Sequence, residues 1–218
     1  MESKLFTPVT FGPLTLRNRT IRSAAFESMC PGNAPSDMLL NYHRSVAAGG
    51  IGMTTVAYAA VTRSGLSFDR QLWMRPEIIP GLRRLTDAVH AEGAAAGIQL
   101  GHCGNMSHKS ICGCTPVGAS GGFNLYSPTF VRGLRADELP ELARAYGRSV
   151  NLAREAGFDA VEIHAGHGYL ISQFLSPATN HRKDEFGGSL QNRMRFMDMV
   201  LEEVMKAAGN DMAVLVKM

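Results

Sequence analysis

Short apolar runs alternate with amphipathic segments along most of this chain, and this alternation limits the possible folds more than any other feature. Most of the runs are apolar almost without a break, which is typical of strands buried on both faces of a parallel sheet. Such a sheet needs helices to cover it, so the alternation predicts an α/β fold. The candidate strands are residues 20–26, 51–57, 95–100, 158–164 and 213–218.

The segments between these runs carry the signals of helix ends. Apolar residues keep helical spacing, as at Leu82, Leu85 and Val89. Residues of N-cap type precede three of the segments, and glycines stand where the helices would end. We therefore expect helices over about residues 37–48 after Ser36, up to Gly93, from Asp137 to Gly157 and from Ser189 to Gly209. Residues 9–16 predict two very short strands around a Gly-Pro turn.

Polar side chains gather at the C-terminal ends of the candidate strands, where a β/α barrel has its active site. They are Gln99, His102, His164, His167 and Lys217. The glycine-rich fingerprint of a dinucleotide-binding Rossmann unit is absent after the first candidate strand. We therefore predict a TIM (β/α)8-type barrel, truncated after about strand 5, with a short N-terminal β-hairpin. Residues 1–218 are expected to form a single domain.

Charge and cysteine content restrict the partners and the compartment. The net charge of +3 is small and evenly spread, which gives no support to binding of nucleic acid or of an anionic membrane surface. No apolar run approaches the ~20 residues that span a bilayer. The four cysteines do not make a dense disulfide framework at this length. We expect a cytoplasmic protein with a small-molecule substrate.

The most informative motif runs from Val161 to Tyr169 and contains His164 and His167. If the strand ends at His164, the following turn brings the two imidazoles together at the barrel mouth. Both imidazoles can then donate hydrogen bonds to one oxygen, and the phenol of Tyr169 can donate a proton. This combination suits reduction of a carbonyl-activated double bond. The alternative is a histidine pair that only ties down a loop, beside a tyrosine that packs.

Several stretches resemble the old yellow enzyme family of FMN-dependent ene-reductases. The most specific resemblance lies in residues 158–196, with His164–Leu170, Gln173–Pro177 and Asn180–Ser189. Further stretches are Leu5–Pro8, Leu16–Arg19 and Ile98–Gly104. The resemblance implies FMN on a β/α barrel and hydride taken from NADH or NADPH. It also implies that residues 181–185 order a loop beside the site through hydrogen bonds.

The resemblance assigns roles to single residues. His164 and His167 would bind the substrate oxygen, and Tyr169 would donate the proton. Gln99 would face the pyrimidine edge of the flavin, and Lys217 would place a cation near flavin N1 and C2=O. Without the resemblance, the alternative for Gln99 is a polar residue that closes a strand, and the alternative for Lys217 is a solvated lysine at a strand end. The remaining cofactor-binding candidates are Ala24, Ala25 and Phe26, otherwise an ordinary core strand, and Tyr58, which is bulkier than the usual small residue.

A metal site is the competing reading of the irregular segment 101–136. It contains His102, Cys103, His108, Cys112 and Cys114, which include soft zinc ligands. Only one residue separates Cys112 from Cys114, whereas zinc knuckles have two to four. We therefore expect no metal.

The combined reading is an FMN-dependent oxidoreductase that transfers hydride from NAD(P)H through flavin to the activated C=C of an enone or dienoyl substrate. The alternative is a non-catalytic half-barrel fragment or assembly module with impaired FMN binding. Barrel phosphate sites are commonly built by the loops after strands seven and eight, which these residues do not supply. An open sheet also leaves unpaired edges, so we expect self-association.

Overall fold

The computed structural model describes residues 3–218 and contains a five-stranded, curled parallel sheet in the order β10-β9-β5-β4-β3. The strands are β3 (Ile21–Arg22), β4 (Met53–Ala60), β5 (Ala95–Gly101), β9 (Ala160–His164) and β10 (Ala213–Lys217). Each pairs in parallel with its neighbours, as in part of a β/α barrel. The predicted parallel sheet of five barrel strands is confirmed.

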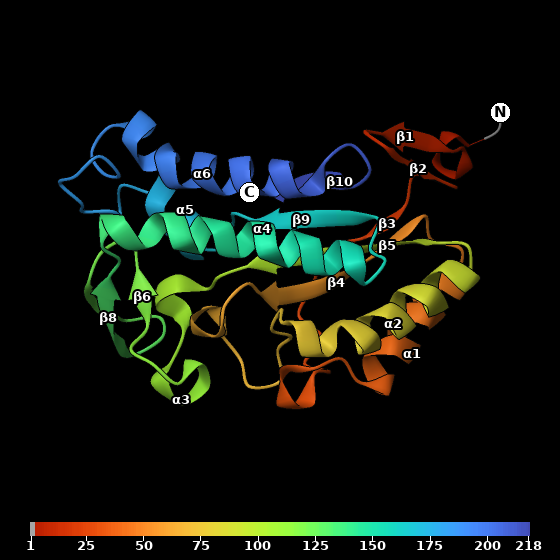
Figure 1. Cartoon of the computed structure of the whole chain (residues 1–218), viewed down its shortest axis with the longest axis horizontal. Helices are drawn as coiled ribbons and strands as arrows, with labels where there is room; N and C mark the ends of the chain where they lie inside the picture. Colours follow the sequence, from red (N-terminus) through yellow and green to blue (C-terminus); the bar gives the residue numbers. More distant parts are fainter. Residues whose placement is uncertain (1–2) are drawn as a thin grey trace.

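Four long helices cover the outer face of the sheet (Figure 1). They are α1 (Asp37–Ala48), α2 (Ile79–Ala91), α4 (Leu139–Glu155) and α6 (Leu190–Ala208). The Ser36 hydroxyl accepts from the amide of Leu39, and the Ser189 hydroxyl accepts from the amide of Asn192. Both N-caps predicted at these serines are therefore confirmed.

The two faces of the sheet differ in chemistry. On β9, Val161 and Ile163 are fully buried and belong to the main core that the helices complete. Because side chains alternate along a strand, Ala160, Glu162 and His164 lie on the other face, inside the curl. The interior is apolar at the start of the strands and becomes polar toward their ends.

Two small sheets lie at opposite ends of the parallel sheet (Figure 1). The hairpin of β1 (Val9–Phe11) and β2 (Leu14–Leu16) closes the start of the strands, where Leu16 packs with Met53 and Ala213. Segment 101–136 lies at the other end. It contains α3 (Lys109–Cys112), β6 (Val117–Gly118), β7 (Gly122–Asn124) and β8 (Thr129–Gly133), with strand order β6-β8-β7. The helix α5 (Leu170–Leu175) follows the histidine motif.

Six 3₁₀ turns lie within residues 3–218, and the last of them shows that one predicted helix cap is wrong. They are Lys4–Phe6, Pro31–Asn33, Arg63–Gly65, Pro76–Ile78, Gly104–Met106 and Ala136–Glu138. Asp137, expected to cap a helix, lies inside the last of these turns, and its carboxylate pairs with Arg135 instead. The helix starts later, at Leu139, because Pro140 favours the first turn of a helix.

The first barrel strand is much shorter than predicted. We expected residues 20–26, but only Ile21 and Arg22 pair with β4. The cause is Glu27, a buried carboxylate that accepts the Arg22 guanidinium at 2.6 Å and the backbone amide of Ala57 at 3.1 Å. A continuing strand would need that amide for its own ladder, so the ladder ends.

Arg17 joins the ends of two helices to the sheet. Its guanidinium donates to the carbonyls of Ala47 at 2.7 Å, Ile51 at 3.0 Å and Glu92 at 2.8 Å. Ala47 and Glu92 lie at the C-terminal ends of α1 and α2, where carbonyls lack helical partners and the helix dipole favours a cation.

We predict that Arg17→Ala lowers the free energy of unfolding by about 1–2 kcal/mol, because three carbonyls lose a charged donor at a largely exposed site. Arg19→Ala is the matched control, since Arg19 makes one 3.3 Å contact to Thr7. Urea denaturation of both variants measures the difference. Equal losses in the two variants would contradict the role given to Arg17.

Candidate functional site

The histidine motif brings its two imidazoles together at the end of β9. His164 ends the strand, and His167 follows in a turn, where its φ of 56° is in the left-handed region. The Nε2 atom of His164 lies 3.2 Å from Nδ1 of His167. An oxygen placed at hydrogen-bond distance from both nitrogens completes a near-equilateral triangle. The pair therefore has the geometry to grip a single acceptor atom.

Burial keeps the His164 imidazole neutral at neutral pH. Burial lowers the pKa of His164 to about 4, and its electrostatic interactions with His167 and Lys217 act in the same direction. The amide of Gly166 faces Nδ1 of His164 at 3.4 Å, which favours a proton on Nε2. When both facing nitrogens carry protons, neither can accept from the other. A ligand oxygen between them then satisfies both donors.

Tyr169 lies beside the pair and packs on a second tyrosine. Its ring centroid is 4.9 Å from that of His164 and 5.3 Å from that of Tyr58. Burial raises the pKa of Tyr169, while polar contact with Ser67 and Tyr58 partly offsets the effect. The phenol therefore stays protonated at neutral pH, as a proton donor must.

The Tyr58 ring packs against the rings of Tyr169 and His164. It is 3% exposed, and its hydroxyl lies 3.0 Å both from the carbonyl of Gly65, to which it donates, and from the hydroxyl of Ser67. Because the hydroxyl is committed to these partners, the ring is fixed in place under Tyr169 and His164. The expected contact of Tyr58 with a flavin carbonyl stays a prediction.

Sheet register places Lys217 and Gln99 next to the histidine motif. Lys217 pairs with His164 across the β10–β9 ladder, and Gln99 pairs with Glu162 across the β5–β9 ladder. The Lys217 ammonium donates to the Ser23 hydroxyl at 3.2 Å and to the Ala24 carbonyl at 3.1 Å. It therefore keeps one further hydrogen for a ligand.

Glu162 fixes the orientation of the Gln99 amide. The Gln99 Nε2 atom donates to the Glu162 carboxylate at 2.6 Å. A carboxylate only accepts, so the amide nitrogen faces it and the amide carbonyl faces away. Sequence reasoning gave Glu162 no role, although its two-residue offset from His164 on one strand marks the same inward face.

These groups fit the imide edge of a flavin ring. That edge presents an N–H donor between two carbonyl acceptors. The Gln99 carbonyl can accept from the N–H, and the second Gln99 amide hydrogen and the Lys217 ammonium can donate to the carbonyls. Within residues 3–218, no donor is bound to the Gln99 carbonyl. If FMN binds here, Gln99 and Lys217 are the side chains that would hold the edge.

The segment Ala24–Phe26 forms one wall of the same region. The Ala24 carbonyl accepts a hydrogen bond from the Lys217 ammonium, and the Ala25 carbonyl accepts one from the Arg22 guanidinium. Phe26 is 39% exposed and stacks on Phe68 with ring centroids 4.4 Å apart. The predicted contact of the three residues with the flavin face remains a prediction.

His102 is directed away from the site, although it also follows a barrel strand. It is 1% exposed, its Nδ1 accepts from the amide of Gly104, and its Nε2 lies 3.1 Å from the Ser64 hydroxyl. Burial lowers its pKa to about 4. The His102 imidazole therefore holds the loop after β5 in place through these two hydrogen bonds.

Within residues 3–218, the structure offers neither a metal site of His, Cys, Asp or Glu side chains nor a membrane-spanning helix. No group of three or more His, Cys, Asp or Glu side chains is placed to hold a metal ion. No helix in that range is long and apolar enough to cross a membrane.

A cavity of about 540 Å³ opens beside His167. One side is formed by the β7–β8 hairpin, including Asn124 and Tyr126, and the other by the loop after α5, including Thr179 and His181. A molecule held by the histidine pair can extend into this space. Segment 101–136 therefore contributes to the site through its shape.

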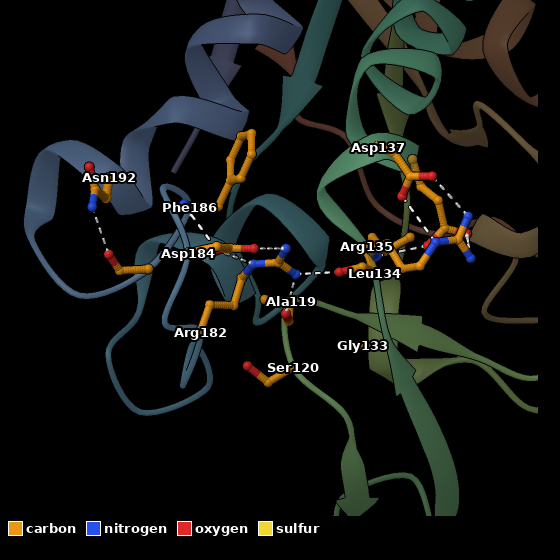
Figure 2. Close-up of polar contacts among 12 residues, drawn as sticks. Ala119, Ser120, Gly133, Leu134, Arg135, Asp137, Arg182, Asp184, Phe186 and Asn192 are labelled. Atoms are coloured by element: carbon orange, nitrogen blue, oxygen red, sulfur yellow. Dashed lines mark hydrogen bonds and ion pairs between the residues drawn. The ribbon is translucent and has the colours of Figure 1, made fainter.

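Arg182 fastens the loop after α5 to that segment (Figure 2). Its guanidinium forms two bonds to the Asp184 carboxylate and donates to the carbonyls of Ala119, at 3.0 Å, and Leu134. The side chain is 8% exposed, and the Arg182 hydrogen bond lowers the pKa of Asp184. The hydrogen-bonded loop expected at residues 181–185 is present.

The match to known proteins identifies the family. A model described as the NADH:flavin oxidoreductase / NADH oxidase family matches residues 4–218. The chain belongs to this family. The predicted relationship to the old yellow enzymes is thereby confirmed, and membership of the family implies FMN with NADH or NADPH as cofactors.

Individual relatives agree. A 4,4'-dithiodibutanoate disulfide reductase of Rhodococcus erythropolis is 44% identical over 98% of this chain and 53% of its own length. An NADPH dehydrogenase of Bacillus subtilis (strain 168) is 37% identical over 94% of this chain and 60% of its own. The structure of an old yellow enzyme homologue from Zymomonas mobilis superposes with a TM-score of 0.90 at 30% identity, covering 98% of this chain and 63% of the homologue. The chain thus spans between about half and two thirds of these proteins, as the N-terminal part of their barrel.

We predict that Arg182→Ala lowers the free energy of unfolding by about 2 kcal/mol, because two carbonyls and a carboxylate lose a nearly buried donor. Hydrogen exchange should accelerate in residues 176–189 and 117–134 together, since Arg182 joins them. Lys183→Ala is the matched control on the exposed side of the same loop. Acceleration in the first segment alone would show that Arg182 does not join the two.

Proposed function

We propose that this chain contributes the substrate-binding side of an FMN-dependent ene-reductase that acts on the activated C=C of an enone or dienoyl substrate. The observation that carries the proposal is the paired imidazoles of His164 and His167 with the Tyr169 phenol beside them. Bound FMN, reduced by NADH or NADPH, supplies the hydride to the β-carbon.

The histidine pair binds and polarises the substrate carbonyl. Two N–H donors converge on one oxygen, and they gain strength as negative charge develops there. Each such oriented donor typically stabilises the transition state by about 3–4 kcal/mol. His164 stays neutral across the physiological pH range, because burial lowers its pKa to about 4.

Tyr169 delivers the proton to the α-carbon. Its phenol is half-buried next to the pair, so a substrate with its carbonyl oxygen on the imidazoles can place its α-carbon near the phenol. Ser67 and Tyr58 are the polar groups beside it, and their contact with the phenol partly offsets the rise in its pKa. Proton transfer by a positioned side chain typically contributes about 10²–10⁴-fold to a rate.

A second substrate class is a disulfide. The 44% identical relative is named for reduction of 4,4'-dithiodibutanoate, an aliphatic disulfide that carries carboxylates. Hydride addition to an S–S bond releases one thiol and one thiolate, and the thiolate then takes a proton. Parallel turnover assays with a cyclic enone and with this disulfide distinguish the two classes.

The alternative function is a non-catalytic half-barrel or assembly module with weak FMN binding. Within residues 3–218, no strand pairs with the outer edge of β10, so self-association through that edge stays part of this proposal. One large apolar core supports residues 1–218 as a single domain. The free state of all four cysteines supports a cytoplasmic location. Flavin titration with light scattering separates the module from the enzyme.

We predict that Tyr169→Phe slows reoxidation of reduced flavin by an enone by about 10²-fold, because only that half-reaction requires the donated proton. Reduction of the flavin by the nicotinamide should be unchanged. Stopped-flow absorbance of the two half-reactions measures both. Equal slowing of both, or of neither, is incompatible with the assignment of Tyr169 as proton donor.

We predict that His164→Ala and His167→Ala each weaken binding of a phenol by about 1.5–3 kcal/mol, since each removes a donor to the ligand oxygen. Titration of the charge-transfer absorbance gives the dissociation constants. His90→Ala is the control, because His90 pairs with Asp159 away from the site. Unchanged affinity for the phenol in both variants would show that the two histidines only stabilise the loop and do not bind the ligand.

A further inference from the structure

Two cysteine side chains face each other in segment 101–136, away from the histidine motif. Their Sγ atoms lie 3.6 Å apart. Both thiols are free, and Cys112 is buried at the end of α3, whereas Cys114 is exposed. We call Cys112 and Cys114 the dithiol.

Gly113 creates this arrangement. It ends α3 with a φ of 75°, in the left-handed region that glycine adopts without strain. The reversal brings Cys114 back over the last turn of the helix, where its carbonyl accepts from the Cys112 thiol at 3.1 Å. A side chain at position 113 would also meet the Arg63 guanidinium, 3.2 Å from an added Cβ.

The pKa of Cys114 is raised from its ordinary value, and two nearby guanidinium groups limit the rise. Burial and the adjoining thiol of Cys112 raise the pKa of Cys114, but the guanidinium groups of Arg63 and Arg132 oppose this. The other two cysteines differ, since burial raises the pKa of Cys30 and of Cys103 to about 12. Cys114 is therefore the accessible thiol with cationic neighbours, and it has a second thiol within reach.

We propose that the dithiol is a redox site that exchanges with low-molecular-weight aliphatic disulfides and closes to a reversible Cys112–Cys114 disulfide. The proposal rests on the 3.6 Å separation, the glycine turn and the unequal exposure of the two thiols. It is independent of the ene-reductase proposal.

The exchange takes two steps. The Cys114 thiolate attacks one sulfur of the disulfide RSSR, so an S–S bond forms to Cys114 and one RS⁻ leaves and takes a proton. The Cys112 thiol then loses its proton and attacks Cys114, which releases the second RSH. In total the dithiol loses two protons and two electrons, and RSSR gains them to become two RSH. The small ring that closes is strained, which makes the disulfide readily reversible.

The test is incubation of the purified protein with 2-hydroxyethyl disulfide under argon, followed by alkylation and peptide mass mapping. We expect the peptide with residues 112–114 to lose two hydrogens, to carry no adduct and to escape alkylation. The rate should rise with pH as more Cys114 ionises. Unchanged thiols, or a stable mixed disulfide in the parent protein, would overturn the proposal.

Single variants separate the two roles. Cys112→Ser should trap the mixed disulfide on Cys114, because the resolving thiol is gone. Cys114→Ser should react about tenfold more slowly or not at all, because Cys112 is buried. Cys30→Ser is the control and should behave as the parent does. Reaction of Cys114→Ser at the parental rate, or release of the adduct from Cys112→Ser, would refute the assignment.

Discussion

The register of β9 against its two neighbours determines where the polar groups of the site lie. In-register pairing places His164 beside Lys217 on one side and Glu162 beside Gln99 on the other. Val161 and Ile163 fix that register, because a shift by one residue would move these fully buried side chains to the polar interior. The apolar face of one strand therefore sets the chemistry on its opposite face.

The turn after β9 stores strain that the surrounding structure offsets. His167 has a φ of 56°, which costs a non-glycine residue about 1–3 kcal/mol. Gln173, on α5, donates to the carbonyl of Gly168 at 2.7 Å and to the carbonyl of Cys103 at 3.1 Å. These bonds tie the turn to the loop after β5. The same helix thus holds the second imidazole in its unfavourable conformation and joins the loops that follow β5 and β9.

Much of the architecture is predictable from local sequence, because buried strands and amphipathic helices carry their own periodicity. The parallel sheet, the caps at Ser36 and Ser189 and the positions of His164 and Lys217 at strand ends all follow from that local information. The features that were missed depend on contacts between distant residues. Glu27 ends β3 by taking the amide of Ala57, thirty residues away. The β6-β8-β7 sheet forms from strands of two, five and three residues, which are too short to show a periodicity in the sequence.

Burial shifts the pKa values of His164 and Tyr169 in opposite directions, and it leaves both side chains neutral at neutral pH. It lowers the pKa of His164 and raises the pKa of Tyr169, so each side chain is neutral and protonated where donation is needed. Lys217 is the cation in register with this pair, and its bonds to Ser23 and Ala24 anchor the charge beside the expected flavin edge. In the proposed reaction, the hydrogen bond from neutral His164 to a carbonyl oxygen strengthens as negative charge develops on that oxygen. The proposed site would thus favour the charge distribution of the transition state over that of the bound substrate.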